Sequence, residues 1–351
     1  MSDLASLLSH YAVGALQSST LIDKGLIHAT YKVETETGPY CFQRLHSVLS
    51  NDGVAQDYER VTGYLSQKGF PAPRLLHTRT GQLLLDDEEG HRWRLTTWLE
   101  GESVSSFSSL SQVYSAAALL GRFHNTMTEL EYDFQSKHPL HNTPLHLERL
   151  EKALAAHQDS VWWSEVKPLA DEVMRALKPL LLPDTLPRRV VHGDPKVSNF
   201  LFDESLEAVA LIDLDTCTQH SVLVDLGDAI RSWCREGSEA EEQHFRLDRF
   251  EQMLDGYAST APSLQVEEVQ RLATAGPMIT LELTARFLTD VLEDSYFGWD
   301  SSQYPSRSHH NLARAKGMLF LANSMQSNMS SMKEVVKHAF GAECSDSISL
   351  R

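Results

Sequence analysis

The stretch VVHGDPKVSNFLFDESLEAVALIDLD, residues 190–215, decides the fold of this chain. Its apolar runs, RVVH, NFLF and AVALID, have the length and the β-branched or aromatic content of buried strands, and polar segments separate them. The first polar segment contains Asp194, Lys196 and Asn199, and Asp213 ends the last apolar run. The pattern therefore predicts alternating strands and loops, with polar side chains where the strands end.

These residue types and their spacing suit metal-assisted phosphoryl transfer. A hydroxyl that attacks a γ-phosphate loses its proton late and needs a positioned carboxylate, so we expect Asp194 to be the catalytic base. Lys196 supplies a point charge for the transferred phosphate. Mg²⁺ prefers hard oxygen ligands, which Asn199 and Asp213 provide. The competing interpretation, a plain turn at an Asp-Pro pair, explains only a fragment of the pattern.

Composition bounds the class of protein and its partners. The chain has 351 residues and a formal net charge of −17, which disfavours nucleic acid and anionic membranes as partners. An anionic substrate such as ATP therefore needs local cations and metal. The four cysteines form no C-x-x-C pair, and no apolar run reaches a membrane-spanning length. The first residues lack the basic region and long apolar run of a signal peptide, so we do not expect one. We expect a cytoplasmic protein with reduced thiols.

The predicted elements divide the chain into two lobes. Residues 1–98 form a β-rich N-terminal lobe, in which residues 1–16 are expected to form a short amphipathic helix and residues 20–46 antiparallel strands. Residues 99–351 form a mostly helical C-terminal lobe. This pattern predicts an α+β fold. Helical periodicity covers residues 108–127, 144–182, 225–234, 239–259, 264–293 and 308–338.

Nucleotide contacts are expected from the N-terminal lobe and from the linker that follows it. The strand YCFQRL offers Gln43 and Arg44 where a kinase has a lysine that holds the α- and β-phosphates. Glu59, on the following helix, is the candidate partner of that cation, or else a solvated helix residue. Backbone groups from Thr97 to Leu99 are candidates for binding an adenine edge, with a plain sheet edge as the alternative. The turn at residues 23–30 is expected over the phosphates.

The string HGDPKVSNFLFDE, with IDLDT and DLGDAIR after it, resembles the aminoglycoside phosphotransferase and choline kinase superfamily. Together with LELTARFLTDVLEDSYFGWD and HNLARAKG, it is most similar to the branch of N-acetylhexosamine 1-kinases. The resemblance implies a protein-kinase-like bilobal fold and transfer of phosphate from ATP, with Mg²⁺, to a hydroxyl. In that branch the acceptor is the anomeric hydroxyl of an N-acetylated hexose. His192 would then brace the catalytic loop.

Candidate acceptor residues follow the central stretch. Asp215 projects to the same side as Asp213 if the chain remains extended, and is expected to assist the metal or the substrate. Asp228 and Arg231 share one face of a helix and suit sugar hydroxyls, although an ordinary intrahelical ion pair has the same spacing. Arg286 and Tyr296 are candidates through the resemblance alone.

Two alternatives to a sugar kinase remain open. The missing strand lysine and the glycine-poor turn also suit a nucleotide-binding pseudokinase. The loop TCTQHSVLV, residues 216–224, departs from the family pattern beside the catalytic strand, so the acceptor is alternatively an aminoglycoside, choline or a homoserine-like alcohol. In either case the expected partner of the enzyme is a small molecule with a hydroxyl, and the sequence does not determine the oligomeric state.

Overall fold

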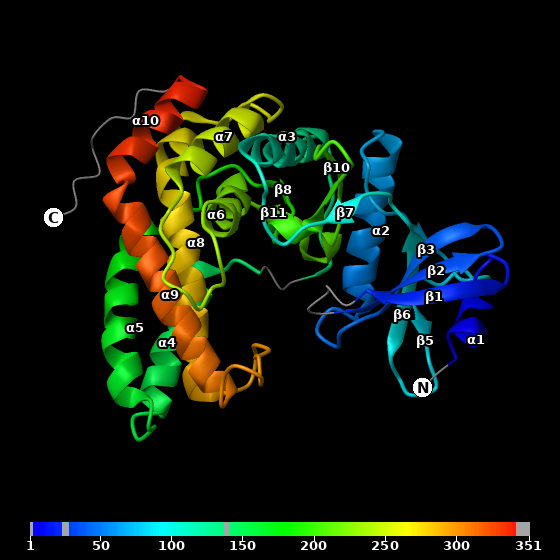
Figure 1. Ribbon diagram of the computed structural model, residues 1–351, viewed down its shortest axis with the longest axis horizontal. Coiled ribbons are helices and arrows are strands. Elements are labelled where there is room, and N and C mark those ends of the chain that lie inside the picture. The colour runs from blue at the N-terminus through cyan, green and yellow to red at the C-terminus, as the bar shows by residue number, and fades with distance from the viewer. Residues whose placement is uncertain (1–2, 23–27, 137–139, 342–351) are drawn as a thin grey trace.

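The computed structural model describes residues 3–22, 28–136 and 140–341, and it has two lobes (Figure 1). An antiparallel sheet with helices α1 and α2 makes the smaller lobe, and eight α-helices with short strands make the larger one in the described part of the chain. The predicted α+β, kinase-like fold class is confirmed. The turn expected at residues 23–30 falls largely outside the described residues.

The N-terminal sheet has the strand order β1-β2-β3-β6-β4, and every neighbouring pair is antiparallel. Strand β5 pairs with β6 outside this order. A short hairpin joins β2 to β3, since β2 ends at Thr35 and β3 begins at Gly38. The strands are β1 (Leu16–Ile22), β2 (Ala29–Thr35), β3 (Gly38–Arg44), β4 (Leu75–Leu76), β5 (Leu85–Asp86) and β6 (Arg92–Thr97).

Two helices accompany this sheet. Helix α1 (Leu4–Leu8) is much shorter than the helix expected within residues 1–16, because strand β1 already begins at Leu16. Helix α2 (Asp52–Gln67) starts at Asn51, whose side chain accepts a hydrogen bond from the Val54 N–H. It lies between the sheet and the larger lobe (Figure 1), and its apolar face belongs to the main core of that lobe.

Short strands in the C-terminal lobe carry the central stretch of sequence. Strand β9 (Phe200–Phe202) pairs with β10 (Ala208–Leu211) and with β7 (Glu102–Ser103), which follows the linker between the lobes. Strand β8 (Arg189–Val191) pairs with β11 (Thr218–His220). The predicted alternation of strands and loops is therefore present. The boundary between residues 98 and 99 stays a prediction.

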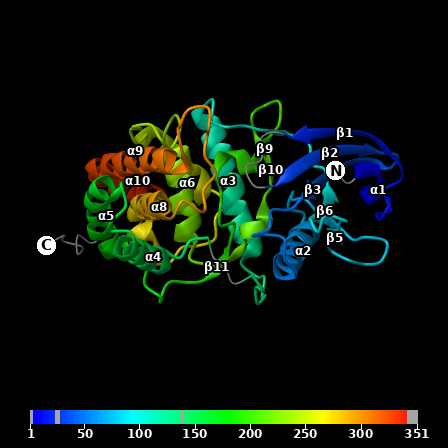
Figure 2. The ribbon, with the colours of Figure 1, turned by 90° about the horizontal axis from the view of Figure 1, so that it is seen from below.

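The remaining helices enclose a large apolar core around helix α8 (Val266–Glu293). They are α3 (Leu110–Met127), α4 (Thr143–Ala156), α5 (Trp163–Leu177), α6 (Val222–Trp233), α7 (Leu247–Ala258), α9 (Arg307–Ser327) and α10 (Met329–Phe340). The helix expected over residues 239–259 begins only at Leu247. Figure 2 shows α5, α9 and α10 at the end of the molecule away from the sheet.

Helices α6 and α8 approach closely because glycines lie at their crossing. A Cβ on Gly227 of α6 would lie 2.6 Å from the carbonyl oxygen of Ala275, and a Cβ on Gly276 of α8 would lie 2.4 Å from Ile230. Such separations are shorter than van der Waals contact, so larger residues would push the helices apart. The crossing fixes α6, which supports the site described below.

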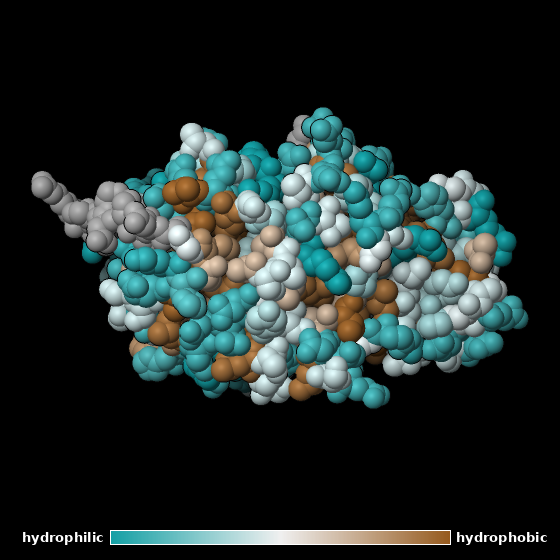
Figure 3. Space-filling model, turned by 90° about the horizontal axis from the view of Figure 1, so that it is seen from above, coloured by the Kyte–Doolittle hydropathy of each residue, from teal (hydrophilic) through white to brown (hydrophobic). Residues whose placement is uncertain are grey.

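The surface in Figure 3 mixes hydrophilic and hydrophobic residues, and the hydrophobic ones form several separate groups. None of the helices in the described ranges combines the length and the apolar character needed to cross a bilayer.

Candidate active site

Asp225, in the first turn of α6, holds the backbone of the loop that precedes Asp194. Its carboxylate accepts hydrogen bonds from the N–H groups of His192, at 2.6 Å, and Gly193, at 2.8 Å. The buried His124 lies 2.9 Å from the same carboxylate. Burial opposes ionisation of Asp225, but the hydrogen bond from His124 and the neighbouring charges outweigh it, so its pKa is lowered. A buried anion therefore fixes the start of the loop.

The loop is also tied to the segment that follows β10. The His192 Nε2 atom donates to the Ile212 carbonyl at 2.9 Å, and the Thr216 hydroxyl donates to the His192 carbonyl at 2.8 Å. Gly193 has a φ of +87°, and a Cβ there would lie 2.5 Å from the Thr216 carbonyl oxygen. The contact required for the predicted brace at His192 is present.

Asp194, Lys196 and Asp213 lie together on this framework. The Lys196 ammonium is 2.6 Å from the Asp194 carboxylate and 3.9 Å from that of Asp213. Burial raises the pKa of Asp194; the Lys196 charge opposes that rise, and the carboxylates of Asp228 and Asp213 reinforce it. The side chain of Asp194 still keeps 20% of its surface exposed, which leaves it accessible to a small molecule.

Asn199 lies on the same loop, in the 3₁₀ turn η2 (Val197–Asn199). Its amide NH₂ donates to the backbone carbonyl of Asp194 at 2.7 Å. This hydrogen bond fixes the amide plane, and the carbonyl oxygen of the same side chain is the atom that would bind a hard cation. The sequence-predicted residues Asp194, Lys196, Asn199 and Asp213 are thus brought to one place.

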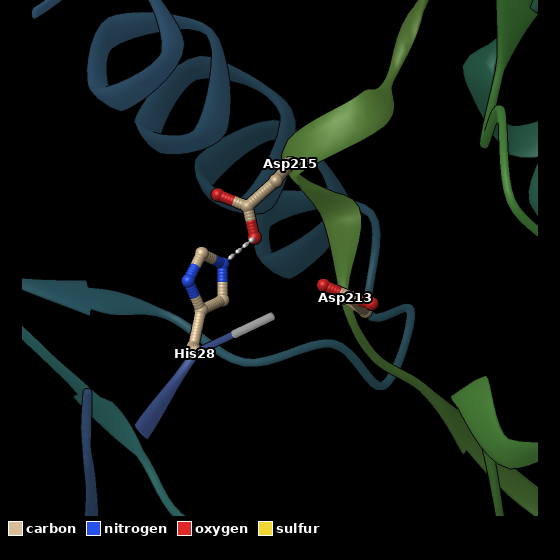
Figure 4. A group of neighbouring side chains, drawn as sticks. All are labelled: His28, Asp213 and Asp215. Atoms are coloured by element: carbon tan, nitrogen blue, oxygen red, sulfur yellow. Dashed lines mark ion pairs between the residues drawn. The ribbon is translucent and has the colours of Figure 1, made fainter. Parts of the chain in front are cut away.

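Asp213 does not continue the extended strand. It adopts a left-handed conformation, with φ of +63°, and the 3₁₀ turn η3 (Leu214–Thr216) follows it. The expectation that Asp215 reaches the side of Asp213 through an extended chain is therefore wrong, because the backbone turns at Asp213. The turn nevertheless brings the carboxylates of Asp213 and Asp215 near one another. Potential ligand atoms of His28, Asp213 and Asp215 lie within 4.8 Å of one another (Figure 4).

Asp215 is neutralised by a cation from the other lobe. The guanidinium of Arg94, on β6, makes two parallel hydrogen bonds to it, one of them at 2.7 Å and the other, to Oδ1, shorter. Burial raises the pKa of Asp215, but the Arg94 charge and its hydrogen bonds outweigh burial and hold the pKa well below its usual range. His28 lies 3.6 Å from the second oxygen (Figure 4).

The donors present fit a magnesium ion. Asp213 supplies a carboxylate and Asn199 a carbonyl oxygen, the hard ligands that Mg²⁺ takes up alongside phosphate oxygens. Because Arg94 engages Asp215, a cation here would take its protein oxygens first from Asp213 and Asn199.

Arg94 is itself fixed by N-terminal residues. Its Nε atom donates to the side-chain carbonyl of Gln43 at 2.9 Å, and Gln43 donates to the Thr30 hydroxyl at 3.0 Å. The guanidinium lies 4.2 Å from the centre of the Tyr58 ring on α2. Sequence reasoning missed Arg94. The available signal was a charged residue between Trp93 and Leu95 in a strand that is otherwise apolar at this point.

The other residues that the sequence predicts to bind the nucleotide are more dispersed than the residues of the catalytic loop. Arg44 is exposed at the end of β3. Glu59 pairs with His77 rather than with a cation on β3. The Thr97 N–H donates to the Arg74 carbonyl at 2.9 Å, and Leu99 follows in the linker.

Asp228 and Arg231, the predicted acceptor residues, form a buried ion pair on α6. The guanidinium of Arg231 contacts one carboxylate oxygen of Asp228 through two nitrogens, each at 2.8 Å, and also contacts Glu239 at 3.0 Å. Asp228 lies close enough to Asp194 to raise its pKa. Arg286 lies over the rings of Tyr296 and Phe297.

A bilobal fold with a loop that gathers a carboxylate, an ammonium and two further oxygen donors is the arrangement of a kinase. The chain belongs to the phosphotransferase enzyme family, whose model matches residues 18–262. The homoserine kinase of Methylocella silvestris is 26% identical over 291 residues, which cover 82% of this chain and 85% of that protein.

Solved structures share the fold at low identity. The amicoumacin kinase hAmiN, in complex with AMP-PNP, Ca²⁺ and amicoumacin, has a TM-score of 0.62 and 16% identity, covering 88% of this chain and 91% of that one. A microcompartment-associated aminopropanol kinase has a TM-score of 0.62 and 16% identity, covering 94% and 97%. The predicted family and the predicted enzyme class, a phosphotransferase with an alcohol acceptor, are confirmed.

Proposed function

We propose that this enzyme transfers the γ-phosphate of ATP to the anomeric hydroxyl of a sugar or of an N-acetylated amino sugar, with Asp194 as the base. The observation that carries the proposal is the grouping of Asp194, Lys196, Asn199 and Asp213 on one braced loop and the turn beside it. The motifs that resemble N-acetylhexosamine 1-kinases support the sugar.

Asp194 receives the proton of the attacking hydroxyl. Its carboxylate is accessible, and its contact with Lys196 fixes its orientation before the acceptor arrives. Lys196 spans Asp194 and Asp213, so its ammonium is placed to contact the phosphate during transfer. When bound by Asp213 and Asn199, Mg²⁺ supplies positive charge to the phosphate oxygens.

On the nucleotide side, we propose that the exposed Arg44 contacts the phosphates and that backbone groups near Leu99 bind the base. Gln43 acts through Arg94, because its side-chain oxygen accepts from that guanidinium. Glu59 and Thr97 remain weaker candidates, since His77 and Arg74 already occupy their polar groups. We place the enzyme in the cytoplasm, which agrees with the free thiols of its described cysteines.

A second candidate acceptor is homoserine or another amino alcohol. The relative from M. silvestris, which is named a homoserine kinase, aligns with 82% of this chain, and this similarity supports homoserine as the alternative acceptor. The two candidates share the transfer step and differ only in the acceptor pocket, so the choice of acceptor can be tested separately from the base.

The substitution Asp194→Asn tests the base. Because the amide cannot accept the proton, we expect the rate of transfer to fall about 10²- to 10⁴-fold, measured by phosphorus NMR with ATP, Mg²⁺ and pooled sugars or homoserine. Asp203→Asn, in the exposed turn after β9, is the matched control and should retain its rate. A near-normal rate in Asp194→Asn would remove Asp194 from the mechanism. Nucleotide binding by the wild-type protein without transfer to any acceptor would favour a pseudokinase instead.

A further inference from the structure

Helix α6 contacts the loop around Asp194 at a second point, at the C-terminal end of the helix. The indole N–H of Trp233, the last residue of α6, donates to the backbone carbonyl of Pro195 at 2.8 Å. Trp233 exposes 1% of its surface, and Pro195, the residue directly after Asp194, is buried as well. A buried donor on α6 therefore meets a buried acceptor on the loop.

The first contact of α6 lies on the other side of Asp194. There Asp225, in the first turn of the helix, accepts from the N–H groups of His192 and Gly193. The two ends of one helix thus support the backbone before the catalytic base and the backbone after it. The position of Asp194 relative to α6 is fixed from both directions.

Proline makes the contact at Pro195 effective for its neighbour. The pyrrolidine ring locks φ of Pro195, so the peptide group that carries the Pro195 carbonyl is stiffly linked to Asp194. The peptide groups of Asp194 itself are held within the loop: its N–H donates to His192 Nδ1 at 3.2 Å, and its carbonyl accepts from Asn199 at 2.7 Å. The contact with Trp233 completes the support of this short segment.

The indole ring is held in place by two aromatic neighbours. Phe107 and Phe200 pack edge-on against the ring of Trp233, with ring centroids 5.3 Å and 5.2 Å away. Phe200 begins strand β9, directly after Asn199. The indole cannot turn without moving these close-packed rings, so the direction of its N–H is set before any substrate binds.

We propose that Trp233 is a positioning residue of phosphoryl transfer. Its indole N–H orients the peptide group after Pro195 and thereby aims the carboxylate of Asp194 at the attacking hydroxyl. A small rotation of this segment slows transfer, because the base must lie within hydrogen-bonding reach of the hydroxyl proton. Trp233 is buried and acts through the loop. This inference rests on the proposed function and adds a residue to its machinery.

The test replaces Trp233 in the full chain with β-(3-benzothienyl)alanine, introduced at an amber codon. Sulfur then stands where the N–H was, so the donor is lost while the ring still packs against Phe107 and Phe200. The acceptors are a sugar panel, namely N-acetylglucosamine, N-acetylgalactosamine, glucose and galactose, and homoserine. The acceptor that the wild type phosphorylates best is used for all variants.

Single-turnover transfer with saturating ATP, Mg²⁺ and acceptor should slow about 3- to 10-fold, the equivalent of one neutral hydrogen bond in the transition state. The ATP concentration for half-saturation should stay unchanged, because the indole does not contact the nucleotide-binding residues. Trp233→Phe, which also loses the donor, should slow transfer at least as much. Thermal unfolding shows whether each variant is folded under assay conditions.

The same analogue in place of Trp93 is the matched control. This buried indole of β6 also donates its N–H, to the carboxylate of Asp87 at 2.9 Å, but in the smaller lobe. Asp87 keeps the N–H groups of Glu89 and His91 as donors. Transfer should proceed at the wild-type rate, which separates the effect at Trp233 from any general effect of the analogue.

The substitution Asp194→Asn shows whether Trp233 acts through the base. The carboxylate that the indole helps to aim is absent from this variant, so loss of the indole N–H should cause no further decrease in rate. A residue that only maintains the packing of the lobe would slow the wild type and Asp194→Asn by the same factor.

Three results would count against this role of Trp233. Transfer at the wild-type rate with the analogue at Trp233 would show that the N–H does not position the base. An equal decrease in the Asp194→Asn background, or with the analogue at Trp93, would reduce Trp233 to a packing residue and leave the kinase function standing. Transfer to no acceptor by the wild type would overturn the proposed function, and this inference with it.

Discussion

Arg94 is one of the residues through which the smaller lobe contacts the turn at Asp213 and Asp215. Its two hydrogen bonds to Asp215 are buried, and Gln43 and Tyr58 hold the guanidinium from the sheet and from α2. A buried ion pair contributes little net stability against an apolar replacement, but a single unpaired partner is costly. Arg94 therefore fixes the geometry of the turn more than it stabilises the fold.

Arg94→Met should destabilise the protein by about 3–5 kcal/mol, because Asp215 is left buried without a counter-charge. The double variant Arg94→Met with Asp215→Leu should recover most of this loss. Denaturant unfolding of the single and double variants measures both values. A decrease of less than about 1 kcal/mol in the unfolding free energy of Arg94→Met would mean that solvent reaches the ion pair of Arg94 and Asp215.

The His141 and Glu282 pair should stabilise the fold only within a pH window. Glu282 has its pKa lowered from 4.5 to about 2: burial opposes this shift, and the charge and hydrogen bond of His141 outweigh it. Stability from a lowered carboxyl pKa is present above the unfolded value and is lost as the pH falls toward the folded value. This contribution therefore declines below about pH 4.5.

The pKa of His141 is raised from 6.5, so its contribution is complete below that value and is lost as the pH rises through the folded pKa. Asp228 reinforces the shift and Arg286 opposes it. The difference in unfolding free energy between wild type and Glu282→Gln should thus be largest between about pH 4.5 and 6.5. The exposed Glu293→Gln, on the same helix, should show no such maximum. A difference in unfolding free energy that does not change with pH would contradict a charged pair of His141 and Glu282.

At the scale of elements, the crossing of α6 and α8 positions the catalytic loop. Helix α6 carries Asp225 at its start and Asp228 one turn later, while α8 carries Glu282. A small separation of the two helices would move the anion that holds His192 and Gly193. The glycines at the crossing are therefore a structural requirement of the site.

Gly227→Ala should destabilise the protein by about 1–3 kcal/mol, since its Cβ would overlap the Ala275 carbonyl. Gly63→Ala, on α2, is the matched control: nothing lies within 4 Å of its Cβ, and the gain in helix propensity should stabilise it slightly. Thermal unfolding compares the two. Equal stability of both variants would show that α6 can shift without cost.

At the scale of the whole molecule, local patterns predicted the α+β composition and the alternation of strands and loops around Asp194, because these depend on residues close together in sequence. The kinase-like fold was implied by the resemblance of the motifs. Asp194, Lys196 and Asn199 lie within six residues. The bond between Arg94 and Asp215 spans 121 residues and joins two lobes, so no local periodicity reveals it. The pairing of His141 with Glu282, 141 residues apart, was missed for the same reason.

The expectations that failed did so because tertiary structure overrides propensity. Glu59 has the helical position expected for a kinase ion pair, yet it pairs with His77, and β3 offers no lysine. The chain after β10 turns at Asp213 instead of extending, since the left-handed conformation there starts the following 3₁₀ turn.

The most direct measurement is phosphorus NMR of the products that the wild-type protein makes from ATP, Mg²⁺ and the sugar panel. We expect a new resonance of a sugar phosphate, split by coupling to the anomeric proton. This resonance should be absent with Asp194→Asn. Transfer of phosphate at an undiminished rate by Asp194→Asn, or no transfer to any sugar by the wild type, would contradict it.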